Sequence, residues 1–218
     1  MIEAVLFDLD DTLGDWATAV ENAVGVAVAG LPKEDAKRLR EALREFVCVR
    51  RDGRVVDRHH WRLFQPEMEW AALFGEPAIA ETFQSAFSAA QMPVAYVDAS
   101  VLAEISREYR VALLTNNPYG RSALIEYGLL RHFEAVVMMD EPFHKPHARA
   151  FEAACDALAL APDRIAMVGD SLANDIEGAA MAGMLPIWID RFHDHYPLDS
   201  GALRIEQLWE LPALLRSL

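Results

Sequence analysis

The sequence of 218 residues has few of the features that mark secreted or membrane-embedded proteins. Its two cysteines, Cys48 and Cys155, are too few for a disulfide framework and are expected to be small buried apolar residues. No stretch approaches the roughly 18 uninterrupted apolar residues of a membrane span. The N-terminus has no basic segment followed by a long apolar run, so no signal peptide is apparent. We therefore expect a soluble cytoplasmic protein with no membrane partner.

Positive charge is also scarce. Lys and Arg number 20 against 34 Asp and Glu, which gives a formal net charge of −14. This balance argues against a general nucleic-acid-binding protein, which normally has a basic surface. The deficit is uneven, because ten of the 20 basic residues lie between residues 33 and 62, together with six acidic ones. That segment has a net charge near +4 in an otherwise acidic chain.

Short apolar runs typical of buried parallel strands recur along the chain. The expected strands are 4–7, 110–114, 134–138, 165–168 and 185–189. Helical patterns lie between and after them, at 101–107, 119–127, 147–158, 173–181 and 206–215. Strand and helix thus alternate, which predicts an α/β fold with a parallel sheet covered on both faces.

About a hundred residues separate the first two expected strands, far more than a strand–helix–strand connection usually needs. The inserted patterns are helical rather than strand-like. They run over 34–49, 56–73 and 79–90, and Asp52-Gly53 breaks the first from the second. We predict a small all-α domain at residues 15–90, inserted into an α/β core domain that consists of residues 1–14 and 91–218.

Four polar motifs follow expected strands. They are Asp8-Leu9-Asp10, Thr115-Asn116-Asn117, Lys145-Pro146 and the segment from Gly169-Asp170 to Asp175. Ligands of open parallel sheets bind at the carboxyl ends of the strands, where residues far apart in sequence converge. The set supplies a nucleophilic carboxylate, further carboxylates, a hydroxyl and a cation, which together suit a phosphate-handling site.

In order and spacing these motifs resemble those of the haloacid dehalogenase superfamily, and the resemblance covers the whole chain apart from the helical insertion. It implies a Rossmann-like doubly wound sheet with an α-helical cap inserted after the first motif. It also implies that Asp8 is a nucleophile that forms an aspartyl-phosphate, and that Asp10 protonates the leaving oxygen and then activates water. Dehalogenases of the superfamily lack the second carboxylate, so Asp10 favours the phosphatase branch, near phosphoglycolate phosphatases and nucleotidases.

Hard oxygen ligands at such a site suit Mg²⁺. The resemblance implies that Asp8, the carbonyl of Asp10 and the side chain of Asp170 are its protein ligands. Asp175 could bind the ion directly or through water, or could orient a neighbouring residue. Alternatively, Asp175 could only cap the following helix.

Thr115 and Asn116 are candidate donors to a phosphoryl oxygen, and Lys145 is a candidate positive charge beside the nucleophile and the phosphate. Each has an ordinary alternative, since Thr-Asn-Asn-Pro is a good turn and a Lys before Pro is usually only exposed. Asn117 is expected to be structural. His193-Asp194-His195 is expected to be a surface turn.

Four arginines surround the Asp52-Gly53 break, namely Arg50, Arg51, Arg54 and Arg58. A loop at this break could reach toward the core site, where an Arg would suit bidentate binding of a second anionic group of the substrate. The alternative for each arginine is a solvated helix face with ion pairs such as Lys37 with Glu41.

We therefore predict a Mg²⁺-dependent phosphatase that acts on a small phosphorylated metabolite and has no nucleic-acid partner. Alternatives on the same core are a phosphomutase and a phosphonate hydrolase, whose Schiff-base lysine could only be Lys33 or Lys37. A non-catalytic phosphate-binding protein is a further alternative. The sequence leaves the substrate open, and also the choice between monomer and homodimer.

Overall fold

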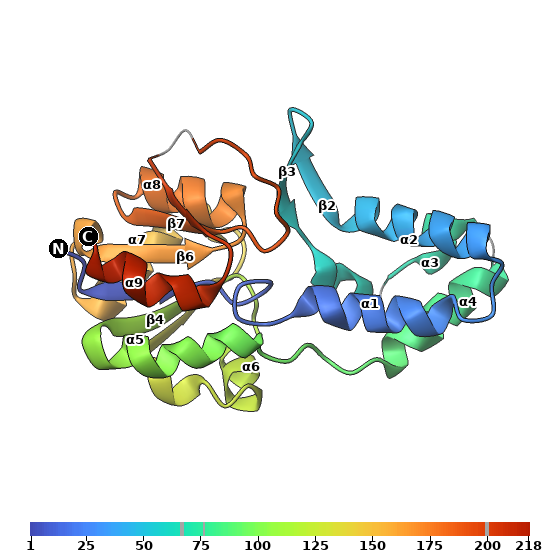
Figure 1. The fold of residues 1–218 in the computed structure, drawn as a ribbon, viewed down its shortest axis with the longest axis horizontal. Helices are drawn as coiled ribbons and strands as arrows, with labels where there is room; N and C mark the ends of the chain where they lie inside the picture. The colour runs from blue at the N-terminus through green and yellow to red at the C-terminus, as the bar shows by residue number, and fades with distance from the viewer. Residues whose placement is uncertain (66–67, 76, 199–200) are drawn as a thin grey trace. The chain divides into compact units, whose positions relative to one another are not determined.

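The computed structural model describes residues 1–65, 68–75, 77–198 and 201–218 (Figure 1). The chain divides into two compact units. Unit 1 consists of Met1–Gly14 and Ala95–Leu218, and unit 2 consists of Asp15–Val94. Each unit has its own hydrophobic core. None of the described helices is both long enough and apolar enough to cross a membrane.

Unit 1 is built on a six-stranded parallel sheet. Its strands are β1 (Ala4–Phe7), β4 (Arg110–Thr115), β5 (Ala135–Met138), β6 (Ile165–Gly169), β7 (Leu185–Ile189) and β8 (Leu203–Ile205). Their spatial order is β5-β4-β1-β6-β7-β8, and each neighbouring pair is parallel. The connections therefore leave β1 in opposite directions, which confirms the predicted doubly wound α/β fold. The carboxyl end of β1 lies where the strand order reverses, which is the usual ligand-binding point of such sheets.

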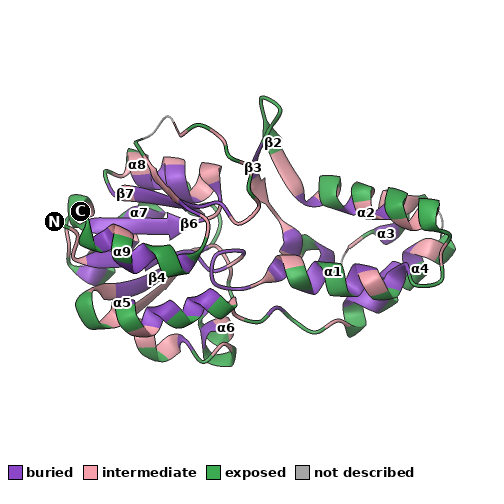
Figure 2. Cartoon of the chain, in the orientation of Figure 1, coloured by how far each residue is buried: buried purple, intermediate pink, exposed green. Residues whose placement is uncertain are grey.

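Helical segments cover both faces of this sheet. They are η2 (Val97–Val101), α5 (Leu102–Glu108), α6 (Gly120–Glu126), η3 (Leu130–His132), α7 (Ala148–Leu158), η4 (Pro162–Arg164), η5 (Leu172–Glu177), α8 (Gly178–Met181), η6 (Leu208–Glu210) and α9 (Leu211–Arg216). Val5 and Phe7 pack in one cluster with side chains of α5, α6 and α9. Ala4 and Leu6 pack in another cluster with side chains of α7 and α8. Because strand side chains alternate between faces, the inner strands β1, β4, β6 and β7 are buried on both sides, and Figure 2 shows β4, β6 and β7 mostly as buried.

The sequence analysis did not predict β8. This strand pairs with β7 from Ile187–Leu203 to Ile189–Ile205 and lies at the edge of the sheet. Three residues are too few to show an alternating pattern, so a strand of this length is invisible to periodicity. The helix expected at 206–215 is present as η6 followed by α9.

Unit 2 packs its helices around one apolar cluster. Its elements are α1 (Trp16–Ala27), α2 (Lys33–Val47), β2 (Cys48–Arg51), β3 (Arg54–Arg58), η1 (His60–Phe64), α3 (Trp70–Phe74) and α4 (Pro77–Ala89). Leu39 and Leu43 on one face of α2 are buried in this cluster with Phe83 and Phe87 of α4. The helices expected at 34–49 and 79–90 are thus present as α2 and α4.

The all-α prediction for the inserted segment is wrong in one respect, because β2 and β3 form an antiparallel hairpin. Asp52 and Gly53 are its two-residue loop, with φ angles of 51° and 78°. Positive φ at both loop positions is the reason why Asp-Gly favours tight hairpins. The sequence analysis interpreted this dipeptide only as a helix break. In the described part of 56–73 the expected helix is replaced by the end of β3, η1 and α3, and residues 66 and 67 lie outside the described residues.

Phe83 tests the described core of unit 2. It is fully buried, and its ring centroid lies 4.5 to 6.4 Å from those of Trp70, Phe74 and Phe87. Phe83→Ala is expected to lower the free energy of unfolding by about 3–5 kcal/mol, because it removes buried apolar surface and leaves a cavity. Urea unfolding followed by circular dichroism measures the loss. Val26→Ala, on the exposed face of α1, is the control and is expected to change stability by less than about 0.5 kcal/mol. Equal losses in the two variants would contradict the described packing.

Candidate active site

The side-chain ammonium of Lys145 lies between two carboxylates. Nζ donates to Asp8 Oδ1 and to Asp175 Oδ1, each at 2.6 Å. The Lys145 side chain is 3% exposed, and those of Asp8 and Asp175 are 10% and 1% exposed. Burial by itself would lower the pKa of Lys145, but the charges of Asp175 and Asp8 and the hydrogen bonds to them raise this pKa above its ordinary value. Lys145 is therefore a fixed positive charge beside Asp8.

Asn116 fixes the backbone of Lys145, which lies between β5 and α7. Its Nδ2 donates to the carbonyl oxygen of Lys145 at 3.2 Å, and its Oδ1 accepts the Lys145 N–H at 2.8 Å. This reciprocal pair joins the segment after β5 to the carboxyl end of β4. Asn116 thus positions the lysine, a role that the sequence analysis did not assign to it.

Asp175 lies in η5, a wide helical turn that precedes α8. Its Oδ2 accepts the Ser171 N–H at 3.1 Å, while Oδ1 accepts from Lys145. Gly169 makes room for this carboxylate, because a Cβ at residue 169 would lie 2.2 Å from Asp175 Oδ2. The glycine at the end of β6 is therefore required by the close approach of a side chain.

Three carboxylates meet near the carboxyl ends of β1 and β6. Asp8, Asp170 and Asp175 each place one oxygen within 4.8 Å of the others. Asp170 also accepts from Thr12 Oγ1 at 3.3 Å, and its carbonyl oxygen accepts from Trp188 Nε1 at 2.9 Å. The three carboxylates carry more negative charge than the Lys145 ammonium neutralises. Oxygen donors of this kind fit a hard divalent cation such as Mg²⁺.

The carboxylate of Asp10 is oriented by Asn117. Nδ2 of Asn117 lies 3.1 Å from both Oδ1 and Oδ2 of Asp10. Oδ1 of Asn117 accepts the Tyr119 N–H at 2.8 Å, and the Asn117 N–H donates to Thr115 Oγ1 at 3.1 Å. The sequence analysis assigned Asn117 only to a turn and missed this contact. Its place in the second motif was a signal, but a contact across 107 residues depends on strand order and not on local spacing.

Arg50, Arg51, Arg54 and Arg58 lie on β2 and β3 in unit 2, whereas the motif residues belong to unit 1. Arg50 donates through Nε and Nη2 to the carboxylate of Glu45 at 3.2 and 2.9 Å. Its charge is therefore paired within unit 2, although on a strand and not on the helix face that the alternative interpretation predicts. The other three arginines include two exposed ones, Arg51 and Arg54.

His193 and His195 lie in the turn after β7. With Glu206 they place ring nitrogens and a carboxylate oxygen within 4.8 Å of one another. The guanidinium of Arg204, however, contacts both His195 Nδ1 and Glu206 Oε1. A protein cation thus already lies in this group. Asp190 closes the turn by accepting backbone N–H groups of two of its residues, so a structured surface turn is the description that fits.

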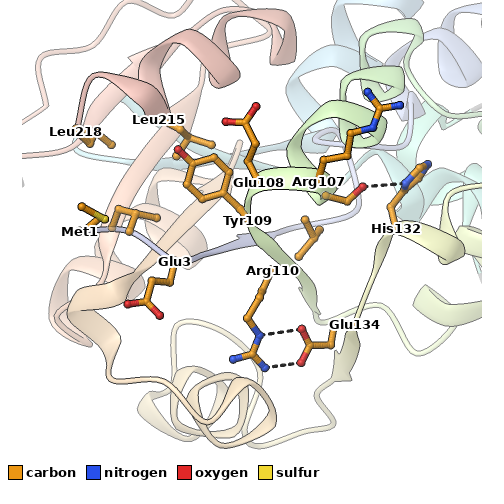
Figure 3. Close-up of a pocket in the computed structure, with 13 residues that line it drawn as sticks. Met1, Glu3, Arg107, Glu108, Tyr109, Arg110, His132, Glu134, Leu215 and Leu218 are labelled. Carbon is orange, nitrogen blue, oxygen red and sulfur yellow. Dashed lines mark hydrogen bonds and ion pairs between the residues drawn. The ribbon is translucent and has the colours of Figure 1, made fainter.

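A pocket of about 690 Å³ lies at the opposite edge of the sheet, at the amino ends of β1 and β4 (Figure 3). Its lining includes Glu3, Ser106, Tyr109, Arg110 and Glu134. Arg110 Nε donates to Glu134 at 2.8 Å, and Figure 3 shows this pair among the side chains that line the pocket. None of the motif residues is among the residues that line the pocket.

Comparisons with known proteins identify the family of this chain. The sequence profile of haloacid dehalogenase-like hydrolases matches residues 2–183. Glyceraldehyde 3-phosphate phosphatase of Methanothermobacter thermautotrophicus is 32% identical over 206 residues, which are 87% of this chain and 86% of that protein. Phosphoserine phosphatase of Thermus thermophilus is 34% identical over 157 residues, which are 69% of this chain and 62% of that protein.

A solved structure shows the same fold. It is that of the HAD-hydrolase YfnB from Bacillus subtilis bound to magnesium, with a TM-score of 0.67 and 17% identity over 98% of both chains. The matched profile covers most of the sequence, and the two named relatives are phosphatases. The chain belongs to the haloacid dehalogenase-like hydrolase family, and to its phosphatase branch.

Proposed function

We propose that this enzyme hydrolyses the phosphate monoester of a small metabolite with the help of Mg²⁺, through an aspartyl-phosphate on Asp8. One observation carries the proposal. Asp8 accepts a 2.6 Å hydrogen bond from buried Lys145, and one of its carboxylate oxygens lies within 4.8 Å of oxygens of Asp170 and Asp175, close enough for one cation to bind all three. The two relatives are named for small phosphorylated substrates, and YfnB is reported with magnesium. These names support the substrate class and the cation.

The main barrier to this reaction is charge. A carboxylate nucleophile is repelled by the phosphoryl oxygens unless positive charge neutralises them. Lys145 supplies one such charge next to Asp8 Oδ1. A bound Mg²⁺, held by Asp8 and Asp170, would supply Lewis-acid stabilisation of the phosphoryl group. Thr115 Oγ1 accepts from Asn117, so its own hydroxyl hydrogen can donate to a phosphoryl oxygen.

Two displacements complete the reaction. In the first, an Asp8 carboxylate oxygen bonds to phosphorus while the bond from phosphorus to the ester oxygen breaks, and Asp10 gives its proton to the leaving alkoxide. In the second, water attacks the acyl phosphate, and Asp10 takes the proton of that water. Inorganic phosphate leaves, and the Asp8 carboxylate and protonated Asp10 are restored. Asp175 contributes by holding Lys145 in place. We propose that its contact with the cation is through water.

The phosphonate-hydrolase alternative needs a reactive lysine in the inserted unit. Lys33 is the first residue of α2, and Lys37 lies one turn later. Lys37 is 69% exposed and pairs with Glu41 at 4.0 Å. An exposed lysine beside a carboxylate lacks the desolvated pocket that activates an amine for Schiff-base formation. The phosphatase proposal is therefore preferred.

Asp8→Asn is expected to lower kcat by about three orders of magnitude or more, because an amide cannot serve as the nucleophile. Phosphate release from a panel of metabolite phosphates, with Mg²⁺ and with EDTA, measures the effect and identifies the substrate class. EDTA is expected to abolish release by the wild type, and added Mg²⁺ to restore it. Asp163→Asn, at an exposed position of η4, is the matched control and should behave as the wild type. Near-normal hydrolysis by Asp8→Asn would refute the proposed function.

Asn117→Ala is expected to lower kcat/KM about ten- to a hundredfold, because a hydrogen bond to a charged group contributes roughly 1.5–3 kcal/mol. The cause is the loss of an amide that contacts both oxygens of Asp10. Steady-state kinetics with the best substrate of the panel measures it. Asn117→Asp is the informative second variant: it keeps the size of the side chain but places a second carboxylate beside Asp10. Unchanged kinetics in both variants would show that Asp10 needs no orientation by this residue.

Arg54→Ala tests the proposal that the β2–β3 hairpin binds a second anionic group of the substrate. It is expected to raise KM for the best substrate about tenfold, the effect of one charged hydrogen bond, and to leave KM for p-nitrophenyl phosphate nearly unchanged. Arg38→Ala is the control, because Arg38 is exposed on α2 and lies near Asp35. A rise of equal size for both substrates would remove the argument for substrate recognition by Arg54.

A further inference from the structure

We infer that Arg191 is a positioning residue for this reaction. It holds the β1 turn, which we define as residues 8–14, so that Asp10 faces the leaving oxygen. The inference rests on the proposed function, because it concerns proton transfer by Asp10. Arg191 belongs to none of the four motifs, and its contacts join three segments of unit 1 that are distant in sequence.

The contacts of Arg191 are short and buried. Nη1 and Nη2 donate to the two carboxylate oxygens of Asp98 at 2.9 and 3.0 Å. Nη2 also donates to the carbonyl oxygen of Thr12 at 2.7 Å. The guanidinium carbon lies 3.8 Å from the centroid of the Tyr96 ring. The side chains of Arg191 and Asp98 are only 8% and 7% exposed.

Asp98 and the segment that carries Arg191 are themselves fixed. Asp98 Oδ2 accepts the N–H of Leu208 at the start of η6, at 2.8 Å. Arg191 follows Asp190, whose carboxylate accepts two backbone N–H groups of the turn after β7 and pairs with Arg204 Nε at 3.1 Å. The Asp190 N–H in turn donates to Ile205 O at 2.8 Å. The guanidinium is therefore directed at the β1 turn by a structured segment and not by a freely rotating side chain.

The β1 turn has an unusual backbone that needs such support. Asp11 has a φ of 56°, a left-handed conformation that costs free energy for a residue other than glycine. Backbone hydrogen bonds from Asp11 N–H to Gly14 O and from Gly14 N–H to Leu9 O close the turn at 2.9 Å each. The Thr12 peptide between them is the one that Arg191 contacts. An ion pair this well buried contributes little net stability by itself, so geometric control of the turn is the role that its contacts favour.

Displacement of the Thr12 peptide would shift two groups of the site, the side chain of Asp10 and the Thr12 hydroxyl that contacts Asp170. Asp10 lies two residues before Thr12, and the Thr12 hydroxyl donates to Asp170 at 3.3 Å. Asn117 orients the Asp10 carboxylate from the side of β4, whereas Arg191 fixes the backbone that carries it. A shift of about 1 Å in a reacting group can lower a rate about a hundredfold. Arg191 acts through the turn and does not touch the reacting atoms.

This role predicts an effect that depends on the leaving group. An alkoxide is a poor leaving group and needs the proton of Asp10, whereas p-nitrophenolate leaves readily without one. Misplacement of Asp10 therefore slows formation of the phosphoenzyme from an alkyl phosphate more than from p-nitrophenyl phosphate. The measured quantity is the ratio of kcat/KM for glycerol 1-phosphate to kcat/KM for p-nitrophenyl phosphate. This ratio does not depend on the fraction of enzyme that is active, so general damage to the fold leaves it unchanged.

Arg191→Lys is the first variant, because it keeps a positive charge beside Asp98 but loses the planar fork that reaches both Asp98 and Thr12. It is expected to lower the ratio by at least about tenfold, in the same direction as the larger effect expected of Asp10→Asn. Arg110→Lys is the matched control. Arg110 makes the same set of bonds, a two-point pair with Glu134 and a 2.7 Å bond to the Leu158 carbonyl, but at the amino end of β4 (Figure 3). It is expected to leave the ratio unchanged.

A second variant tests the same contact in case Arg191→Lys does not fold. Arg191→Gln with Asp98→Asn removes both charges together, so no buried charge is left unpaired, and it should lower the ratio as Arg191→Lys does. Addition of Arg191→Lys to Asp10→Asn is expected to lower the ratio no further, because both changes act on the same proton transfer. A ratio within about twofold of the wild type in both Arg191 variants would overturn the inference, since Asp10 would then be correctly placed without this contact. That outcome leaves the proposed function intact, because the Asp8→Asn variant tests the proposed function separately.

Discussion

The buried ammonium of Lys145, shared between the carboxylates of Asp8 and Asp175, is the interaction around which the site is organised. Two buried carboxylates at such short range would repel each other, and each would be expensive to remove from water without a positive partner. Lys145 lowers that cost for both and keeps Asp8 at the carboxyl end of β1. Asp170 adds a third carboxylate, so the group offers the oxygen donors that suit a divalent cation. Under the proposed function, the same charge balance that stabilises the site would also favour binding of a phosphoryl group.

Residues that follow several strands of unit 1 hold the charged side chains of the site in place. Asn116 at the end of β4 holds the backbone of Lys145, and Gly169 at the end of β6 lets the Asp175 carboxylate approach the chain. Asn117 holds the Asp10 side chain, and Arg191 after β7 contacts the turn that follows β1. These contacts all lie at the carboxyl edge, where the strand order reverses at β1. A sheet of this topology therefore lets four separate connections restrain one turn.

The sequence predicts the doubly wound sheet and the main site residues because short local patterns indicate them. Short apolar runs show the strands of the doubly wound sheet, and the motifs that follow β1, β4 and β6 carry the residues that meet at the site. What it does not predict depends on pairing over distance or on few residues. The β2–β3 hairpin needs only the two residues Asp52 and Gly53 to turn, and β8 has three residues. The contacts of Asn117 with Asp10 and of Arg191 with Thr12 span 107 and 179 residues, so no spacing in the sequence could indicate them.

Under the proposed function, the phosphoryl group is transferred to Asp8 before water accepts it. Rapid quenching of the Mg²⁺-loaded enzyme during turnover, followed by borohydride reduction and peptide mass spectrometry, tests this directly. An acyl phosphate is reduced at its carbonyl carbon, so the account predicts that residue 8 becomes homoserine in the presence of substrate and stays aspartate without it. Reduction at another carboxylate, or at none while phosphate is being released, would contradict the account. The first result would relocate the nucleophile, and the second would favour direct attack by water.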